Sequence, residues 1–410
     1  MPSSSPIIGT ARPALDGPWQ RTAQFAGLLD SNGQLASTIF AEMTDLARRT
    51  GAINLGQGFP DTDGPRVVLD AAKAAIDQGI NQYSPGRGEP GLLAAIAEHQ
   101  QRFYGLEWDP ASEIIVTAGA TEALAATVLA LVRPGDEVIT FEPFYDAYAA
   151  AIGLAGGEHV TVGLVPPTFQ PDLHELDEAF SDKTRMVIVN DPNNPTGAVF
   201  TSEVLQRIVD LAVRHNAIIV TDEVYEHLVF DAATHVPIAT LPGARDRTIT
   251  ISSAGKTFSV TGWKIGWAVG PAELIRAVLT VKQYLTYVNG APFQPAVAAG
   301  LRLDDDFYAG VAADLQRKRD ILIDGLRRAG LEPFCPSGTY FVLVDTSSIG
   351  FADAADLARK LPELCGVVAV PASAFVRSEH AERYRSLLRF AFCKQEDVLR
   401  EAASRLATLR

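Results

Sequence analysis

Two lysines eight residues apart stand in a stretch of the chain that could carry covalent chemistry. The stretch is TITISSAGKTFSVTGWKIGWAVG, residues 248–270, and it contains Lys256 and Lys264. Its β-branched start predicts a buried strand, and only small residues separate that strand from Lys256. A lysine in such a place has room for a group on its amine, and lysine forms Schiff bases when desolvation lowers its pKa. Most loop lysines are merely solvated charges. Residues elsewhere in the chain are therefore needed to distinguish a Schiff-base lysine from a solvated one.

Polar residues follow two further predicted strands. Asp222 and Tyr225 come directly after the apolar run 217–221, where a buried carboxylate needs a cation or hydrogen-bond donors to offset its burial. The strand 185–190 leads into DPNNPTG, residues 191–197, whose prolines and glycine fix the backbone and hold the asparagine amides in set directions. Ordinary turn formation explains the prolines and the glycine well, but it explains the clustered asparagines less well.

A third predicted strand, 114–117, opens into a helix through Gly119, Ala120 and Thr121. Free backbone amides and a hydroxyl at a helix start form a seat for a phosphate group. Tyr145 follows the strand 137–141 and would place an aromatic ring beside that seat. Each feature alone is equally well explained by packing. Combined with Lys256 and Asp222, they describe a pyridoxal phosphate site, in which a buried acid keeps the protonated ring an electron sink.

The elements that must position these residues alternate between strands and helices. Strands are predicted at 114–117, 137–141, 159–162, 185–190, 217–221, 248–251 and 265–269, with helices between most of them. This pattern favours an α/β fold with a mainly parallel seven-stranded sheet between helices. In such sheets ligands bind beyond the carboxyl ends of the strands, where the residues above are found.

The length of 410 residues is too great for one compact core. We predict a large cofactor-binding domain at 61–301 and a smaller α+β domain at 37–60 and 302–410. In the latter, short strands at 340–344, 367–370 and 387–392 alternate with helices. Residues 1–36 are rich in Ser, Pro, Gly and Gln, and we expect a loosely ordered extension there.

Charge and composition argue against several other classes of protein. The net charge of −14 disfavours a nucleic-acid or anionic membrane surface, and three scattered cysteines indicate no metal site. The first residues lack the pattern of a secretory signal, and no apolar run reaches the ~20 residues of a membrane span, so a cytoplasmic protein is expected. Gly86, Gly88 and Gly91 match a dinucleotide-binding pattern, but neighbouring prolines interrupt the strand and helix that it requires.

In its motifs the chain resembles a class I aminotransferase of the fold-type-I pyridoxal phosphate superfamily. It is most similar in these motifs to the kynurenine/glutamine/methionine aminotransferases and to the N-succinyldiaminopimelate aminotransferases. The matching segments run in the family's order from residue 37 to the C-terminus: NLGQGFPD, NQYSPGRGEPGL, TAGATEAL, EPFYDAY, NDPNNPTG, TDEVYEHLVF, SSAGKTFSVTGWKIGW and LLRFAFCK.

The resemblance implies a role for each of these residues around the cofactor. Lys256 would form the Schiff base and move the substrate proton, Asp222 would pair with the ring nitrogen, and Tyr225 with Asn194 would hydrogen-bond the ring oxygen O3′. Tyr145 would stack on the ring. The phosphate would be held by Gly119, Ala120, Thr121, Ser253, Lys264 and, from a second subunit, Tyr83. A homodimer with shared active sites is therefore implied.

The resemblance also implies how substrate is held. Arg389 would grip the α-carboxylate as a planar fork, helped by Asn194 and the backbone at Gly58, while Phe40 would close on the substrate. Asn190 would support this arrangement from behind. Two departures are notable: Lys264 replaces an arginine that is frequent in aspartate-type enzymes, and the segment YVNGA, 287–291, lacks their second arginine. We therefore expect an aromatic, sulfur-containing, amide or N-succinyldiaminopimelate-type donor rather than aspartate.

The expected reaction is ping-pong transfer of an amino group from an L-amino acid to a 2-oxo acid, through an aldimine on Lys256. Two alternatives remain open. A cysteine-S-conjugate β-lyase, or another biosynthetic lyase or cyclase, would use the same residues and cofactor. A non-enzymatic sensor built on this fold would need an added DNA-binding module, which residues 1–36 do not resemble.

Overall fold

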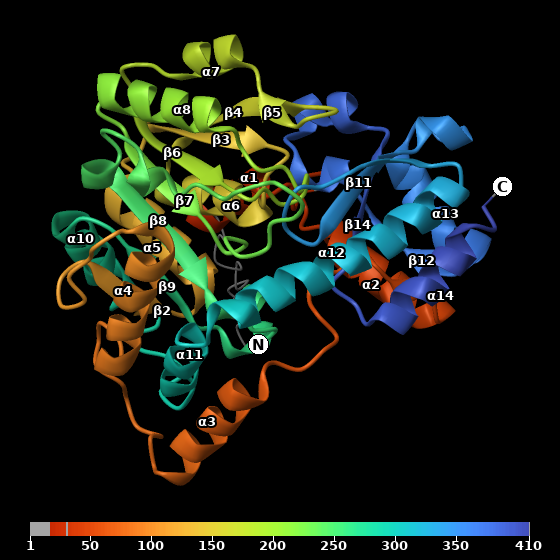
Figure 1. Ribbon diagram of the computed structural model, residues 1–410. Coiled ribbons are helices and arrows are strands. Elements are labelled where there is room, and N and C mark those ends of the chain that lie inside the picture. Colours follow the sequence, from red (N-terminus) through yellow and green to blue (C-terminus); the bar gives the residue numbers. More distant parts are fainter. Residues whose placement is uncertain (1–16, 30–31, 410) are drawn as a thin grey trace, which may run out of the picture.

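A mixed sheet lies at the centre of the larger part of the molecule (Figure 1). The computed structural model describes residues 17–29 and 32–409. The order across the sheet is β2-β9-β8-β7-β6-β3-β4-β5. Its strands are β2 (Ile114–Thr117), β3 (Glu137–Glu142), β4 (Glu158–Val165), β5 (Gln170–Pro171), β6 (Thr184–Asn190), β7 (Ile218–Asp222), β8 (Thr248–Ser253) and β9 (Gly266–Val269).

The sheet is mainly parallel, which confirms the predicted fold class. The strands from β8 to β4 run parallel, whereas β9 is antiparallel to both of its neighbours. The seven predicted strands are present among the described residues, and the two-residue β5 adds a short antiparallel edge beside β4. Strands β2, β6, β7, β8 and β9 are buried along nearly their whole length, as near-continuous apolar runs predict for a sheet covered on both faces.

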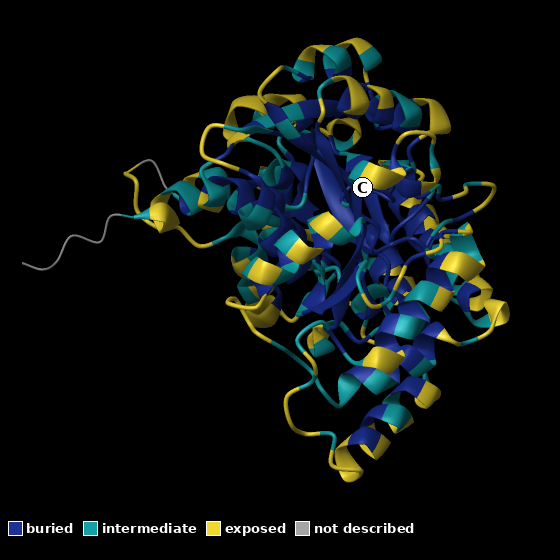
Figure 2. Cartoon of the chain, turned by 90° about the vertical axis from the view of Figure 1, so that its left-hand side faces the viewer, coloured by how far each residue is buried: buried dark blue, intermediate teal, exposed yellow. Residues whose placement is uncertain are grey.

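Helices cover both faces of this sheet, and Figure 2 shows its buried strands inside a shell of half-exposed helices. One face packs against α5 (Gly119–Leu131), α6 (Asp146–Ala155) and α10 (Ala272–Lys282). The other packs against α3 (Arg66–Asp77), α4 (Pro90–Tyr104), α7 (Leu173–Ala179), α8 (Ser202–Arg214) and α11 (Phe293–Leu301). None of the described helices is long and apolar enough to cross a membrane.

Among the described residues, two smaller sheets lie outside the central one: the second sheet has four strands from the C-terminal part of the chain, and the third pairs an N-terminal strand with a C-terminal one. Strands β10 (Glu332–Phe334), β11 (Phe341–Asp345), β14 (Leu387–Ala391) and β13 (Val370–Pro371) form an antiparallel sheet in that order, and β1 (Ile53–Asn54) pairs in parallel with β12 (Val367–Val368). Around them lie α2 (Ile39–Thr50), α12 (Asp305–Arg328), α13 (Ala354–Cys365) and α14 (Glu396–Leu406). The long helix α12 runs from the larger part to this smaller one (Figure 1).

Local signals set several element ends. Helix α2 begins where the Thr38 hydroxyl accepts a hydrogen bond from the Ala41 amide at 3.1 Å, and it ends at Gly51 with a φ of 66°. Asp304 caps α12 in the same manner, accepting from the Phe307 amide at 3.1 Å. A single helical turn, α9 (Ala254–Thr257), follows β8 directly and carries Lys256. Short 3-10 segments lie at Ile238–Thr240, Arg245–Arg247, Thr261–Trp263, Ser347–Ile349, Ala372–Phe375 and Ser378–Tyr384.

Two details differ from the sequence-based expectation. Residues 18–25 are not loosely ordered: they form helix α1 (Pro18–Phe25), which packs against α6, and Arg21 Nη2 donates to the Gly157 carbonyl at 2.7 Å. Residues 1–16 and 30–31 of the predicted extension lie outside the described residues. The predicted strand 367–370 is divided, because β12 pairs with β1 and β13 pairs with β14.

Candidate active site

The carboxyl ends of the central strands meet around one cavity of about 230 Å³. Because parallel strands end at the same edge of a sheet, Asn190 of β6, Asp222 of β7 and Ser253 of β8 come together there. The cavity brings together eleven of the predicted residues: Gly119, Ala120, Thr121, Tyr145, Asn190, Asn194, Asp222, Tyr225, Ser253, Lys256 and Lys264. The remaining four, Tyr83, Arg389, Gly58 and Phe40, do not line it.

Lys256 reaches the cavity from the single turn α9. Its Nζ lies 5.8 Å from the ring centroids of both Tyr225 and Tyr340. Burial lowers the pKa of Lys256, although the nearby negative charge of Asp222 opposes this shift. The lowered pKa increases the fraction of free amine, which is the nucleophilic and basic form.

Asp222 sits at the end of β7, and only 8% of it is exposed. Burial raises the pKa of Asp222, while the Tyr148 hydroxyl counteracts this by donating to Oδ2 at 2.7 Å. The Asn190 side-chain amide donates to the Asp222 carbonyl at 2.9 Å, so the backbone is held as well as the carboxylate. The arrangement suits a carboxylate that faces a cationic ligand atom.

Arg389 lies on β14 and is 3% exposed. Its Nη1 donates to Asn194 Oδ1 at 2.9 Å and its Nη2 to the Gly56 carbonyl at 2.7 Å, while Nε has no hydrogen-bond partner. Burial lowers the pKa of Arg389 to about 10, which leaves the guanidinium charged at neutral pH. A buried cation with an unpaired N–H is the chemistry that an anionic ligand would satisfy.

Aromatic rings surround the Arg389 guanidinium. Its Cζ lies 4.1 Å from the Phe341 ring centroid, 4.4 Å from that of Phe375 and 5.7 Å from that of Phe40. Phe40 comes from α2 and packs edge-on against Phe375 at 5.4 Å between centroids. These rings exclude water from one side of the cation, which strengthens its attraction for a carboxylate.

The start of α5 forms another part of the cavity wall. Ala118 provides no side-chain cap there, so the first backbone amides of the helix depend on other acceptors. Gly119 has a φ of 75°, and a Cβ at this position would lie 3.2 Å from Lys264 Nζ. Lys264 therefore lies against the helix start, where its charge and the helix dipole both favour a phosphate.

Two predicted residues take other positions. Tyr83 is 81% exposed, and its ring packs beside Tyr287 at 5.5 Å between centroids. The Gly58 carbonyl accepts a hydrogen bond from the Tyr340 hydroxyl at 2.7 Å, so the backbone oxygen next to Arg389 is that of Gly56 and not that of Gly58.

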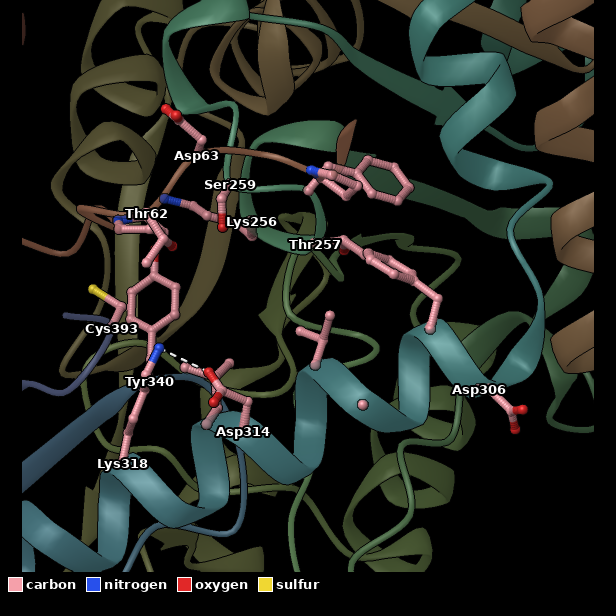
Figure 3. Close-up of a pocket in the computed structure, with 17 residues that line it drawn as sticks. Thr62, Asp63, Lys256, Thr257, Ser259, Asp306, Asp314, Lys318, Tyr340 and Cys393 are labelled. Carbon is pink, nitrogen blue, oxygen red and sulfur yellow. Dashed lines mark ion pairs between the residues drawn. The ribbon is translucent and has the colours of Figure 1, made fainter. Parts of the chain in front are cut away.

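A second cavity, of about 440 Å³, opens on another side of Lys256 (Figure 3). It lies between the loop that carries Thr62 and Asp63 and helix α12, where Lys318 Nζ pairs with Asp314 at 2.7 Å. Tyr340 and Cys393 complete the wall nearest to Lys256. Lys256 thus lines both cavities, and the smaller one also contains the other predicted cofactor residues except Tyr83.

The sequence did not indicate Tyr148, Asp146, Gly56 or Tyr340 as parts of the site. Tyr148 had a usable signal, because it follows Tyr145, the N-cap of α6, by only three positions, and the two rings lie 5.8 Å apart between centroids. The partly buried Asp146, whose pKa burial raises, interacts with the charge of Arg389. Gly56 and Tyr340 belong to distant loops that only the fold brings together.

Comparisons with known proteins agree with this geometry. Residues 50–406 match the family model described as aminotransferase class I and II. The chain is 50% identical over 382 residues to a probable N-succinyldiaminopimelate aminotransferase of Mycobacterium tuberculosis, covering 91% of this chain and 96% of that protein. It is 42% identical over 376 residues to the methionine aminotransferase of Escherichia coli, covering 92% of this chain and 97% of that protein. A solved structure of the M. tuberculosis N-succinyldiaminopimelate aminotransferase superposes with a TM-score of 0.89 at 51% identity, over 92% of this chain and 98% of that one.

Proposed function

Because the chain belongs to the class I and II aminotransferases, it uses pyridoxal phosphate to transfer an amino group to a 2-oxo acid, and we propose that its donor is of the N-succinyldiaminopimelate type. The observation that carries this choice is the identity of 50% over 382 residues with a protein of that name. Segment 287–291 adds support, since it holds no arginine for the side-chain carboxylate of aspartate. Methionine, aromatic amino acids and amino acids with an amide side chain are the alternative donors.

The residues around the smaller cavity fit the cofactor at each of its ends. The uncapped start of α5 and Lys264 suit its phosphate, and the buried Asp222 suits its ring nitrogen. Tyr145 stands at the N-cap of α6 on the wall of the same cavity and is proposed as the stacking ring. When bound, pyridoxal phosphate supplies an electron sink for the bond that breaks at the substrate α-carbon.

Lys256 is proposed as the point of cofactor attachment and as the base that holds the substrate α-proton. Its buried amine, with its lowered pKa, suits both roles. Asp222 would place a negative charge at the ring nitrogen, and the Tyr148 hydroxyl and Asn190 amide hold Asp222 in place. Tyr225 and Asn194 are proposed as donors to the ring oxygen. Both line the cavity beside Asp222.

Arg389 is proposed to bind the substrate α-carboxylate. The unpaired Nε provides one donor of a planar fork, and Asn194 fixes the other side of the guanidinium at 2.9 Å. Phe40 would then cover the bound substrate, because its ring already lies over the cation. Gly58 supports this arrangement through Tyr340 rather than by contact with Arg389.

A panel of donors tests the substrate proposal. N-succinyl-LL-diaminopimelate, methionine, kynurenine, glutamine and aspartate would each be assayed against 2-oxoglutarate, with kcat/KM determined for each. We expect the succinylated donor to give the highest value and aspartate the lowest. The substrate proposal would be wrong if aspartate were preferred, whereas absence of transfer with every donor would contradict the reaction itself.

We also propose a homodimer that shares its active sites. Tyr83 and Tyr287 are 81% and 47% exposed, and Tyr284 and Leu285 beside them are 83% and 46% exposed. Such a patch of large apolar side chains is typical of an interface. Tyr83 lies outside the cavity of its own chain, so it would serve the phosphate of a partner.

Subunit mixing tests this arrangement. Lys256→Ala and Tyr83→Ala proteins would each show low activity alone. A hybrid dimer of the two contains one site with Lys256 from one chain and Tyr83 from the other. Activity that rises on mixing is therefore expected, while a purely additive result, or a monomer with full activity by light scattering, would contradict the shared site.

We extend the proposal to a cytoplasmic location. Cys335, Cys365 and Cys393 are all unpaired thiols, and the last two are buried, which fits a reducing compartment. Cell fractionation with an antibody to the chain tests this, and recovery in a secreted fraction would contradict it.

A further inference from the structure

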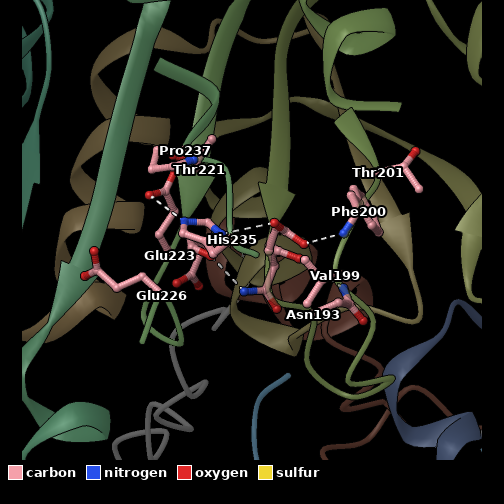
Figure 4. A network of polar contacts seen from close by, with 12 residues as sticks. Asn193, Val199, Phe200, Thr201, Thr221, Glu223, Glu226, His235 and Pro237 are labelled. Atoms are coloured by element: carbon pink, nitrogen blue, oxygen red, sulfur yellow. Dashed lines mark hydrogen bonds and ion pairs between the residues drawn. The ribbon is translucent and has the colours of Figure 1, made fainter. Parts of the chain in front are cut away.

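A buried ion cluster lies behind the strand ends that form the cofactor site (Figure 4). His235, in the loop after β7, contacts Asp191 Oδ2 through Nδ1 and Glu223 Oε2 through Nε2, each at 3.2 Å. The side chains of the three residues are 1–4% exposed. None of them lines the cofactor cavity, so the mechanism above leaves them without a role.

The geometry favours a cationic ring. Both ring nitrogens of His235 face carboxylate oxygens, which can only accept, so both nitrogens must carry a proton and donate. Burial alone would lower the pKa of His235, but the hydrogen bonds and charges of Asp191 and Glu223 outweigh it and raise the pKa to about 10. The ring also faces Tyr104 of α4 at 6.1 Å between centroids and feels the charge of Glu226.

Each carboxylate of the cluster is the chain neighbour of a cofactor-site residue. Asp191 follows Asn190 at the end of β6, and Glu223 follows Asp222 at the end of β7. Because successive side chains of an extended backbone point to opposite sides, Asn190 and Asp222 face the cavity while their neighbours face His235. The imidazolium therefore joins the two strand ends from behind.

Further hydrogen bonds extend this connection. The Asp191 amide donates to the Asp222 carbonyl at 3.3 Å, and the Glu223 amide donates to the Ile251 carbonyl of β8 at 2.8 Å. Asp191 Oδ1 accepts from the Phe200 amide at 2.7 Å, which closes the loop that carries Asn194. Glu226 accepts from Tyr104 at 2.7 Å and from Ser252 at 2.6 Å, next to Ser253 in β8.

We propose that His235 is a positioning residue of the cofactor site: by bridging Asp191 and Glu223 it fixes the distance between Asp222 and the loop from Asn190 to Asn194. Three buried charges are a poor source of stability compared with apolar packing of the same volume. A planar ring with two directed hydrogen bonds is, however, an effective spacer between two strands. The inference rests on the proposed pairing of Asp222 with the cofactor.

The test compares three variants of the cofactor-loaded enzyme. The main measurement is the pH midpoint at which the absorbance of bound pyridoxal phosphate changes, because Asp222 acts on the ring nitrogen and so on that midpoint. Asp222→Asn serves as the reference. His235→Gln is expected to move the midpoint in the same direction and to lower kcat by about 100-fold, since misplacement of a site residue by 1 Å has an effect of this order.

His159→Gln is the matched control. His159 is likewise buried, it contacts Thr140 Oγ1 at 2.7 Å, and burial lowers its pKa to about 3, so it is a neutral core histidine away from the cluster. This variant is expected to lower the melting temperature of the cofactor-free protein without moving the midpoint. A midpoint that shifts equally in both histidine variants would show a general effect of core damage and overturn the proposal.

Glu223→Met covers the case in which His235→Gln does not fold. This substitution keeps an unbranched side chain of similar length and leaves His235 balanced by Asp191, but it breaks the bridge to β7. A stable protein with a shifted midpoint supports positioning, and a stable protein with an unchanged midpoint refutes it. If Asp222→Asn itself left the midpoint unchanged, the proposed role of Asp222 would fail instead, which separates the two claims.

Discussion

Asp222 is subject to two opposing influences that set its charge. Burial favours its protonated form, and the hydrogen bond from the Tyr148 hydroxyl, at 2.7 Å, favours the carboxylate. The balance matters because only the ionised form can pair with a protonated ring nitrogen. Tyr148 therefore acts on the chemistry although it does not need to touch the substrate.

Removing the Tyr148 hydroxyl should lower the activity. In Tyr148→Phe the pKa of Asp222 rises further, because a hydrogen bond to a charged group is worth about 1.5–3 kcal/mol. Activity should fall by roughly tenfold or more, and the acidic limb of the profile of kcat against pH should move to higher pH. An unchanged acidic limb would show that Tyr148 has no influence on Asp222.

Residue types and order were sufficient to predict most of the cavity wall. Lys256, Asp222 and Ser253 each follow an apolar run, and the rule that ligands lie beyond strand ends placed them together. Tyr340 and Gly56 could not be found in this way. Their positions depend on how β11 and β14 of the second sheet lie against the loop that carries Gly56 and Gly58. Long-range packing of that kind leaves no periodic mark in the sequence.

At the scale of elements, the part of the cavity proposed to hold the phosphate depends on the close approach of β9 to the start of α5. Gly266 permits it: a Cβ there would lie 2.5 Å from the Gly119 carbonyl carbon and 2.7 Å from the Ala120 nitrogen. Both atoms belong to the backbone, so neither can move aside without displacing the helix start. The position of the phosphate seat is therefore fixed by the absence of a side chain.

Gly266→Ala should accordingly weaken cofactor retention. An overpacked contact costs about 1–3 kcal/mol, so the Kd of pyridoxal phosphate should rise by roughly tenfold. Gly262→Ala is the control, since a Cβ at Gly262 meets nothing within 4 Å. Titration of both cofactor-free variants measures the difference. Equal Kd values for the two would contradict the steric argument.

The elements themselves were largely predictable, with exceptions that have physical causes. The central strands were identified by their apolar runs, since burial on both faces removes polar positions. Helix α1 was missed because Pro18 and the glycine before it resemble a loop, whereas its stability comes from packing on α6. The stability of such a helix depends on tertiary packing and not on local helix propensity.

For the whole molecule, the ion cluster predicts how stability depends on pH. The folded-state pKa of His235 is raised to about 10, above the ordinary value of about 6.5. Its protonation therefore contributes stability in full below pH ~6.5, and that contribution is lost as the pH rises towards the folded pKa. Between pH 7 and 9 the free energy of unfolding of the cofactor-free protein should fall by up to about 1.4 kcal/mol per pH unit.

Denaturant unfolding at several pH values measures this slope. In His235→Gln the slope over the same interval should be smaller, because the titrating group is absent. His159→Gln should keep the wild-type slope, since His159 is already neutral in the folded protein at these pH values. Parallel slopes in all three proteins would mean that His235 is not protonated in the folded state.

The attachment of pyridoxal phosphate to Lys256 is the central claim, and peptide mapping tests it most directly. Reduction of the loaded enzyme with borohydride would fix the cofactor on its lysine, and tryptic digestion with mass spectrometry would locate the added mass. Modified lysine resists trypsin, so residues 248–264, TITISSAGKTFSVTGWK, should appear as one peptide with the mass on Lys256. Added mass on Lys264, or on no lysine of this segment, would contradict the claim.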